Sequence, residues 1–242
     1  MTVYVTGDVH GRAEYGSSRF AFKNWPLGRT LTRDDAVIVA GDFGFVWDGS
    51  NAEKYWLDWF ESKPWTTCFV DGNHENHHAL AGLPVREWNG GLVHEARPRV
   101  LHLMRGEVFD IDGLTVLAMG GAASNDRQYR REGRSWWPEE MPSEEEMEHC
   151  RASLDRVSWR VDCVVTHEAP AALAEKSCAA SADASIGATG FSDSLASSTG
   201  GSATAPGSSA TTTATSGVTP GIALSTETSC RSKMLRPLLE TF

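Results

Sequence analysis

The chain of 242 residues has no apolar run long enough to cross a bilayer, which takes about eighteen residues. It also lacks a basic segment followed by a long apolar segment at its start, the pattern of a secretory leader. The five cysteines show no Cys-x-x-Cys spacing. This usage disfavours a disulfide framework or a zinc knuckle and favours a reducing compartment. We therefore expect a cytoplasmic protein that makes no membrane contact.

Basic residues are in the minority, because 22 Lys and Arg stand against 32 Asp and Glu for a net charge of -10. This acidic excess disfavours electrostatic binding of nucleic acid, although a local basic site stays open. The composition is 40% apolar and 22% charged, which is typical of a globular protein with a real core.

Charge and aromatic residues are scarce over residues 177–229, which contain three acidic residues, one aromatic residue and no Lys or Arg. Such a composition buries too little apolar surface to offset the entropy lost on ordering. We therefore predict a folded domain over residues 1–176, which holds all nine Trp, and a low-complexity, disordered insert over 177–229. Residues 230–242 are amphipathic and predict a short C-terminal helix.

Strand-like and helix-like segments alternate through the first 176 residues, which indicates an α/β protein. An Asp-Gly pair at 112–113 predicts a tight hairpin, and Ser143 with Glu146 predicts a capping box. The helix over 52–62 is expected to bury four aromatic residues on one side: Tyr55, Trp56, Trp59 and Phe60. Strands are predicted at 3–5, 36–40, 66–70, 92–94, 100–104, 107–111, 114–119 and 163–166, and helices at 52–62, 143–157 and from 169 to 176.

Metal-capable side chains follow four of the predicted strands. The chain reads Gly-Asp-Val-His-Gly at 7–11, Gly-Asp at 41–42, Gly-Asn-His-Glu at 72–75 and Thr-His-Glu at 166–168. Because ligands collect at the carboxyl ends of strands in α/β sheets, we expect these side chains to meet. Oxygen and imidazole donors without thiolate suit Mn, Fe or Zn. Two such ions sharing a carboxylate form the usual apparatus for hydrolysing phosphate esters.

In this order, the GDVHG, GD and GNHE motifs and the lone strand-end histidine resemble the calcineurin-like metallophosphoesterase family over roughly residues 1–176. The resemblance implies a four-layer αββα sandwich, incomplete at its C-terminal part, around two divalent metal ions. It also implies that His74 is catalytic and faces the leaving oxygen. The implied ligands are Asp8 and His10 for the first ion, Asn73 and His167 for the second, and Asp42 as the bridge.

The sequence departs from the family pattern in three places. Phe45 stands where many members have a second Asp, and the run Trp-Asp-Gly at 47–49 lacks the Arg of the protein phosphatase branch. The pattern also closes with Gly-His-x-His, yet none of the eight histidines follows residue 167. Three explanations of this difference stay open: the gene product is truncated, other groups supply these ligands, or the site is impaired. We expect the nearby His77 and His78 to lie on a helix surface rather than to substitute.

A segment rich in Arg and Trp follows the strand at 114–119 and is a candidate substrate-facing region. Arginine suits bidentate contact with phosphate, so we name Arg127, Arg130 and, after the first motif, Arg12 as candidate substrate ligands. Trp136 and Trp137 suit stacking on a base or sugar. The equally weighted alternative is a surface loop whose Trp pair covers the core.

We therefore expect a metal-dependent phosphoric ester hydrolase, a phosphatase or phosphodiesterase, in which metal-bound hydroxide attacks phosphorus in line. Its partner would be a phosphoester small molecule or a nucleotide, and the substrate stays open among phosphomonoesters, cyclic nucleotides, dinucleotide polyphosphates and nucleic acid ends. The alternative is a degenerate, non-catalytic member with a weakened metal site. A third hypothesis is an interaction module that works through residues 177–229.

Overall fold

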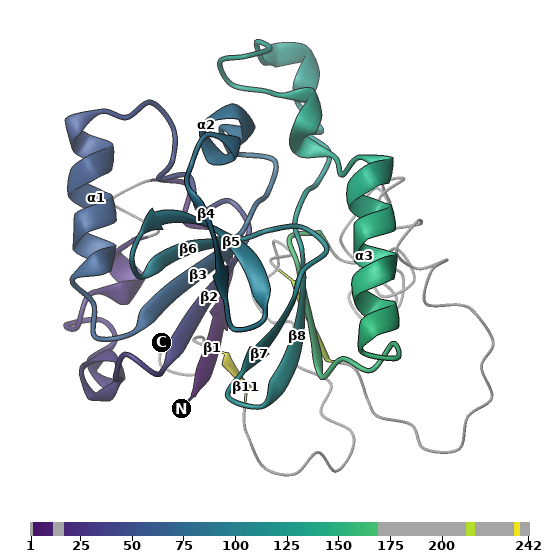
Figure 1. Ribbon diagram of the computed structural model, residues 1–242. Helices are drawn as coiled ribbons and strands as arrows, with labels where there is room; N and C mark the ends of the chain where they lie inside the picture. The colour runs from purple at the N-terminus through teal and green to yellow at the C-terminus, as the bar shows by residue number, and fades with distance from the viewer. Residues whose placement is uncertain (1, 12–16, 169–211, 216–234, 238–242) are drawn as a thin grey trace, which may run out of the picture.

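Two β-sheets packed face to face form the centre of the molecule, and helices cover their outer faces (Figure 1). The computed structural model describes residues 2–11, 17–168, 212–215 and 235–237. Helix α1 (Asn51–Glu61) lies outside the larger sheet and α3 (Glu144–Arg156) outside the smaller one. The layers run helix, sheet, sheet, helix, which confirms the predicted αββα sandwich.

The larger sheet has seven strands in the order β11-β1-β2-β3-β6-β5-β4. The strands from β11 to β6 run parallel, β5 runs antiparallel to β6, and β4 runs antiparallel to β5. Strands β2 and β3 are buried along their whole length, which the continuous apolar run of β2 predicts for that strand. The bounds are β1 Val3–Thr6, β2 Ala36–Ala40, β3 Thr66–Val70, β4 Val85–Trp88, β5 Gly91–Arg97, β6 Val100–Leu103 and β11 Leu235–Pro237.

The smaller sheet has the order β10-β9-β8-β7, with bounds Thr212–Thr215, Cys163–Thr166, Leu114–Met119 and Val108–Ile111 respectively. Strands β7 and β8 form the predicted hairpin, since Ile111 pairs with Leu114. Asp112 and Gly113 between them both have positive φ, 58° and 74°, as a two-residue turn of this hand requires. Strand β9 runs parallel to β8, so both end at the same edge of the sheet.

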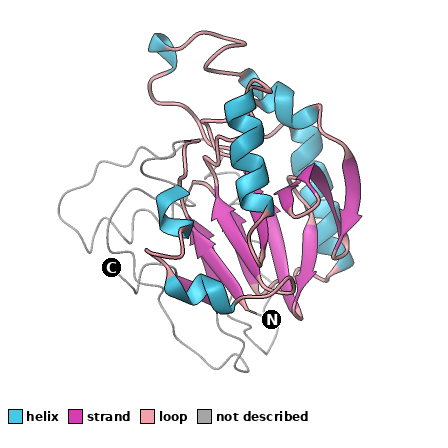
Figure 2. Ribbon diagram, turned by 90° about the vertical axis from the view of Figure 1, so that its left-hand side faces the viewer, coloured by secondary structure: helices cyan, strands magenta, loops and turns pink. Residues whose placement is uncertain are grey.

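Three apolar clusters separate the four layers. Phe43, Phe60 and Phe69 belong to the cluster that packs α1 against the larger sheet. The second cluster fills the space between the sheets with side chains such as Ile38, Phe109 and Val165, and the third joins the smaller sheet to α3. Figure 2 looks from the α1 side, where helices lie in front of the strands. Short helices add to this cover: η1 Ser17–Phe20 and η2 Pro26–Thr30.

Helix α1 differs from the prediction in the direction of one side chain. Phe60 is fully buried and Trp56 and Trp59 pack partly against the core, as expected. Tyr55 is 62% exposed, because the buried stripe of the helix runs through Leu57 and Phe60 instead. The predicted aromatic face is therefore right for three residues and wrong for Tyr55.

The C-terminal predictions need one correction and one addition. Leu235–Pro237 forms a strand beside β1, not the helix predicted over 230–242, because β1 offers an edge of backbone donors and acceptors that an extended segment satisfies. Within the predicted insert, Thr212–Thr215 pairs with β9. The helix predicted from 169 to 176 and the candidate ligand Arg12 lie outside the described residues.

Among the described residues, no helix combines the length and apolar character needed to cross a membrane. Cys68, Cys150 and Cys163 are buried free thiols. Burial raises the pKa of Cys150 to about 11, so this thiol packs as an apolar group rather than as a reactive one.

The capping box at the start of α3 provides a test of the fold. The Ser143 hydroxyl accepts from the Glu146 backbone N–H at 3.2 Å, and the Glu146 carboxylate accepts from the Ser143 N–H at 2.7 Å. We expect Ser143→Ala to lower the free energy of unfolding by about 1 kcal/mol, measured by urea denaturation. Ser158→Ala, an exposed serine beyond the other end of the helix, is the matched control. Equal midpoints for the two variants would contradict the prediction.

Candidate metal centre

The loops after β1 and β2 are bonded to each other at the carboxyl edge of the larger sheet. The backbone N–H groups of Val9 and His10 both donate to the carbonyl of Asp42, at 2.9 and 2.7 Å. The Gly11 N–H donates to the carbonyl of Phe43 at 3.0 Å. This backbone lock fixes the distance between the side chains that the two loops carry.

Glycine permits this approach. A Cβ atom on Gly11 would lie 2.2 Å from the Gly44 carbonyl oxygen, so no larger residue fits the present backbone. A Cβ on Gly41, whose φ is +91°, would lie 2.1 Å from Nδ1 of His167. The glycines before the predicted ligands therefore make room for one loop to contact the next.

Two predicted ligands have left-handed backbone themselves. The φ angles of His10 and Asp42 are 55° and 51°, a conformation that side chains other than glycine seldom adopt. The backbone lock between the two loops holds both residues in place. Such strain concentrates at functional sites, where the direction of a side chain is more important than an unstrained backbone conformation.

One group of donors lies around His10. Its Nε2 is 3.5 Å from Oδ2 of Asp8, and its Nδ1 is 3.5 Å from Oδ2 of Asp42. The ring of His74 meets that of His10 edge to face, with 4.9 Å between centroids. Ligand atoms of His10, Asp42 and His74 all lie within 4.8 Å of one another, which is close enough for one metal ion.

A second group lies around His167, on the other oxygen of the same aspartate. His167 Nε2 is 3.2 Å from Oδ1 of Asn73 and 3.5 Å from Oδ1 of Asp42. His167 Nδ1 lies 3.0 Å from the carbonyl oxygen of Ala40, which only accepts, so the ring proton sits on Nδ1. The other ring nitrogen, Nε2, faces two oxygen atoms.

Oδ1 of Asp42, Oδ1 of Asn73 and Nε2 of His167 are directed at one region. Carboxylate oxygen, amide oxygen and imidazole nitrogen are also the donor types that divalent transition metals accept. The residues that the sequence predicts as ligands therefore fit a metal ion. All five, Asp8, His10, Asp42, Asn73 and His167, lie in the two groups that meet at Asp42.

Two residues with no predicted role support these loops: the buried Glu75 and the half-buried Arg19. The fully buried Glu75 carboxylate accepts from the N–H groups of Phe43 and Gly44, at 2.7 and 3.1 Å, and so holds the loop that carries Asp42. Burial, and then the charge of Asp42, raise the pKa of Glu75 well above its usual value. Arg19 donates to the carbonyl oxygens of Gly7 and Asp8 at 2.7 and 2.9 Å.

The predicted substrate ligand Arg130 reaches the predicted catalytic residue. Its Nη2 is 2.6 Å from Nε2 of His74, and Asp126 holds the same guanidinium at 2.6 Å. Burial lowers the pKa of His74, the charges of Arg130 and His10 lower it further, and Asp42 opposes them. Because Arg130 can only donate, His74 is a neutral acceptor at this contact.

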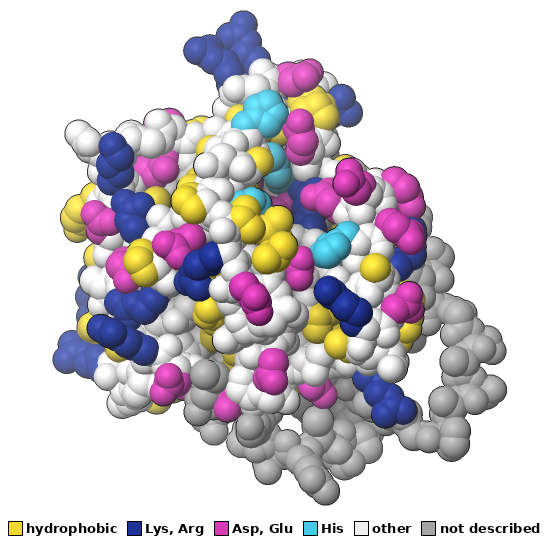
Figure 3. All heavy atoms as spheres, viewed as in Figure 1, with side chains coloured by type: hydrophobic (Ala, Val, Ile, Leu, Met, Phe, Trp, Pro, Cys, Tyr) yellow, Lys and Arg dark blue, Asp and Glu magenta, His cyan; other side chains and the backbone are white. Residues whose placement is uncertain are grey.

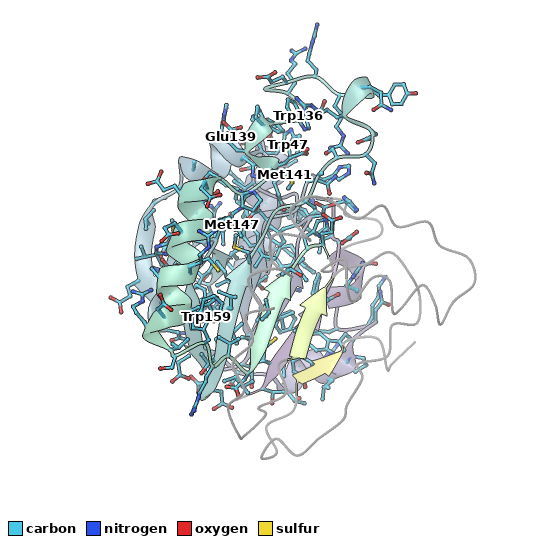
Figure 4. The ribbon with its side chains drawn as sticks, turned by 90° about the vertical axis from the view of Figure 1, so that its right-hand side faces the viewer. Trp47, Trp136, Glu139, Met141, Met147 and Trp159 are labelled. Carbon is cyan, nitrogen blue, oxygen red and sulfur yellow. The ribbon has the colours of Figure 1, made fainter. Side chains whose placement is uncertain are left out.

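Arg130 belongs to an arm (residues 122–140) that rises above the sheets in Figure 1 and carries Lys or Arg side chains at its tip in Figure 3. Arg127 of the arm lies over the ring of Trp136, 3.8 Å from its centroid. Trp136 and Trp137 are 5% and 3% exposed, so they cover the core instead of offering a stacking surface. The ring of Trp137 meets that of Trp47 edge to face, with 5.3 Å between centroids, and Figure 4 labels Trp47 and Trp136 at the base of the arm.

The two histidines of α2 (His77–Ala81) lie apart from the donor groups. His78 is exposed as expected and pairs with Glu139, 3.3 Å away. The predicted surface position of His77 is wrong: it is buried, with Nδ1 3.9 Å from Asp71. Helix α2 turns this side toward the buried Asp71, so periodicity alone could not place it.

A two-sheet α/β sandwich with carboxylate, amide and imidazole donors at its strand ends defines the class: a protein built to hold metal ions at a sheet edge. The model of the calcineurin-like phosphoesterase family matches residues 1–172, and the chain belongs to this family. Membership supports metal-dependent hydrolysis of phosphoesters in general. Comparisons with curated proteins and with solved structures found no match.

Gly41 provides a test of the close approach to His167. We expect Gly41→Ala to lower the free energy of unfolding by more than about 2 kcal/mol, since it adds steric overlap to the strain of a positive φ. Gly49→Ala is the matched control, because Gly49 also has positive φ, +67°, with nothing within 4 Å of its Cβ position. Urea denaturation of both variants measures the difference. Equal losses would show that the His167 contact is unimportant.

Proposed function

We propose that this protein hydrolyses phosphoric esters at a dinuclear metal centre built from the two donor groups. One observation carries the proposal: Asp42 directs Oδ2 to His10 and Oδ1 to His167, each at 3.5 Å. A carboxylate that serves a different histidine with each oxygen has the arrangement of a bridging ligand. Asp8 and His10 would hold one ion, and Asn73 and His167 the other.

When bound, the divalent ions would neutralise the phosphate oxygens and lower the pKa of a coordinated water. Mn is the first ion to test. The chain's own residues would orient the ester. Arg130 presents a guanidinium fork beside the donor groups, suited to bidentate contact with phosphate. His74, next to that fork, would face the leaving oxygen and stabilise the transition state with a hydrogen bond from its ring N–H.

The substrate that we propose is a phosphoester of a small molecule or nucleotide. Its phosphate would displace the Arg130–His74 contact, because both side chains offer groups that an ester oxygen can bond. The ion pair with Asp126 keeps Arg130 over the site. Since the Trp pair of the arm is buried, recognition of the leaving group would rest on the exposed side chains of the arm.

The second candidate function is a non-catalytic member with a weakened metal site. Phe45 favours it, because many members of the family have a second Asp at that position. Elemental analysis of the purified, Mn-loaded protein separates the two proposals. About two ions per chain support the enzyme, and none supports the non-catalytic member.

The bridging position of Asp42 gives the main activity test. We expect Asp42→Asn to lower kcat/KM on aryl phosphate monoesters and diesters in Mn by more than about 100-fold, because both donor groups lose their shared charge. Asp34→Asn, the same change at an exposed position, should leave the rate unchanged. A chelator should abolish wild-type activity and added Mn should restore it. Equal rates for wild type and Asp42→Asn would defeat the proposal.

Arg130 gives a separate test of phosphate binding. We expect Arg130→Ala to lower kcat/KM by about 10–100-fold, the value of a charge-assisted hydrogen bond, with Lys restoring only part of it. Arg134→Ala, at an exposed arginine of the same arm, is the control. Steady-state kinetics on an aryl phosphate measure both. If Arg134→Ala lowers kcat/KM and Arg130→Ala does not, the guanidinium fork of Arg130 is not used.

A further inference from the structure

Asn73 can face the donor group with either end of its amide, and only the oxygen end can bind a metal ion. The two ends have the same shape, so packing cannot choose between them. A hydrogen-bond partner on the far side of the amide must therefore set its direction. The structure supplies this partner from the arm, 51 residues further along the chain, where Ser124 Oγ lies 3.2 Å from Asn73 Nδ2.

Ser124 is itself held by a buried carboxylate. Glu140, which is 4% exposed, accepts from the Ser124 backbone N–H at 3.0 Å and from its hydroxyl at 2.6 Å. The Ser124 hydroxyl is the donor in its bond with Glu140, so its proton points at the carboxylate. The hydroxyl oxygen can then only accept from Asn73. The amide must present N–H₂ to Ser124, which leaves its carbonyl oxygen toward His167, 3.2 Å away.

We propose that Ser124 and Glu140 are positioning residues that fix the direction of the Asn73 amide, so that its oxygen faces the metal ion. The inference rests on the proposed function, since it takes Asn73 as a ligand. The Glu140 carboxylate accepts the first hydrogen bond, and it thereby sets the direction of each hydrogen bond in the series from Glu140 through Ser124 to Asn73. Ser124 contacts the amide nitrogen of Asn73, and Glu140 acts through Ser124.

The base of the arm is anchored at Glu140, the residue that sets the direction of these hydrogen bonds. The Arg105 guanidinium donates to the carbonyl oxygens of Glu139 and Glu140, at 2.8 and 3.3 Å, and to the Asp71 carboxylate. The Ala122 N–H donates to the carbonyl of Glu140 at 3.1 Å, which joins the two ends of the arm. Glu140 therefore has a fixed backbone, and its carboxylate is held close to Ser124.

Glu140→Gln changes the direction of the bonds without changing shape. The new amide can donate to Ser124 Oγ, which frees the hydroxyl proton to bond the oxygen of Asn73. The Asn73 amide then turns its N–H₂ toward the ion. We expect the affinity for Mn²⁺ at one of the two metal positions to fall by about 10–100-fold, because the loss of a residue that supports a metal ligand has an effect of this size in other proteins. Glu139→Gln, the exposed neighbour that pairs with His78, is the matched control.

Ser124 provides the second pair of variants. Ser124→Ala removes the acceptor and should weaken Mn²⁺ binding as Glu140→Gln does, whereas Ser124→Thr keeps the hydroxyl and should restore it. Equilibrium dialysis against Mn²⁺ measures affinity and the number of ions. Hydrogen exchange of the Asn73 side-chain amide, followed by NMR in chelator, reports its direction without any metal. We expect slow exchange in the wild type and Ser124→Thr and faster exchange in Ser124→Ala.

The outcomes separate the inference from the proposed function. If the wild type binds Mn²⁺ and both Glu140→Gln and Ser124→Ala bind it equally well, the positioning role is wrong and the hydrolase proposal stands. If the wild type takes up no ion, the hydrolase proposal fails. The exchange measurement then still decides: equal exchange in wild type and Ser124→Ala would overturn the role of Ser124.

Discussion

The placement of Asp42 is the constraint on which the rest of the site depends. Its side chain is buried, its backbone is left-handed, and its carbonyl accepts two N–H groups from the loop after β1. Its Oδ1 also accepts from the His74 N–H at 2.8 Å. A Cβ on Gly72 would lie 2.1 Å from this same oxygen, so glycine is needed there. One carboxylate thus connects the loops of three parallel strands.

This arrangement concentrates negative charge that the apolar layers cannot solvate. Asp42 and Glu75 lie close enough that the charge of Asp42 adds to burial in raising the pKa of Glu75. Backbone N–H groups from Phe43, Gly44 and His74 offset part of the cost. A bound cation would offset more, so the buried carboxylate and the imidazoles around it are chemically consistent with metal binding.

The strands and their polar ends could be predicted because they depend on local pattern. The apolar run at 36–40 and the strand predicted at 66–70 match β2 and β3 to the residue, and glycine followed by a ligand marks the end of each. Contacts between distant segments left no such signal. Ser124 and Glu140 are ordinary polar residues of a loop, Tyr55 shares a helix period with buried neighbours, and the β1 edge that recruits Leu235–Pro237 appears only once the sheet exists.

The arm is attached to the same stretch of chain that carries Asn73 and His74. Although burial opposes it, the Arg105 guanidinium holds the pKa of Asp71 well below its usual value, so this buried ion pair stays charged. Asp71 directly precedes the Gly-Asn-His-Glu motif, and Arg105 also bonds the carbonyls at the base of the arm. The arm returns two groups to the motif, Ser124 to Asn73 and Arg130 to His74. Because all these contacts share one short stretch of chain after β3, a shift of the arm alters the direction of a predicted ligand and the state of a predicted catalytic residue together.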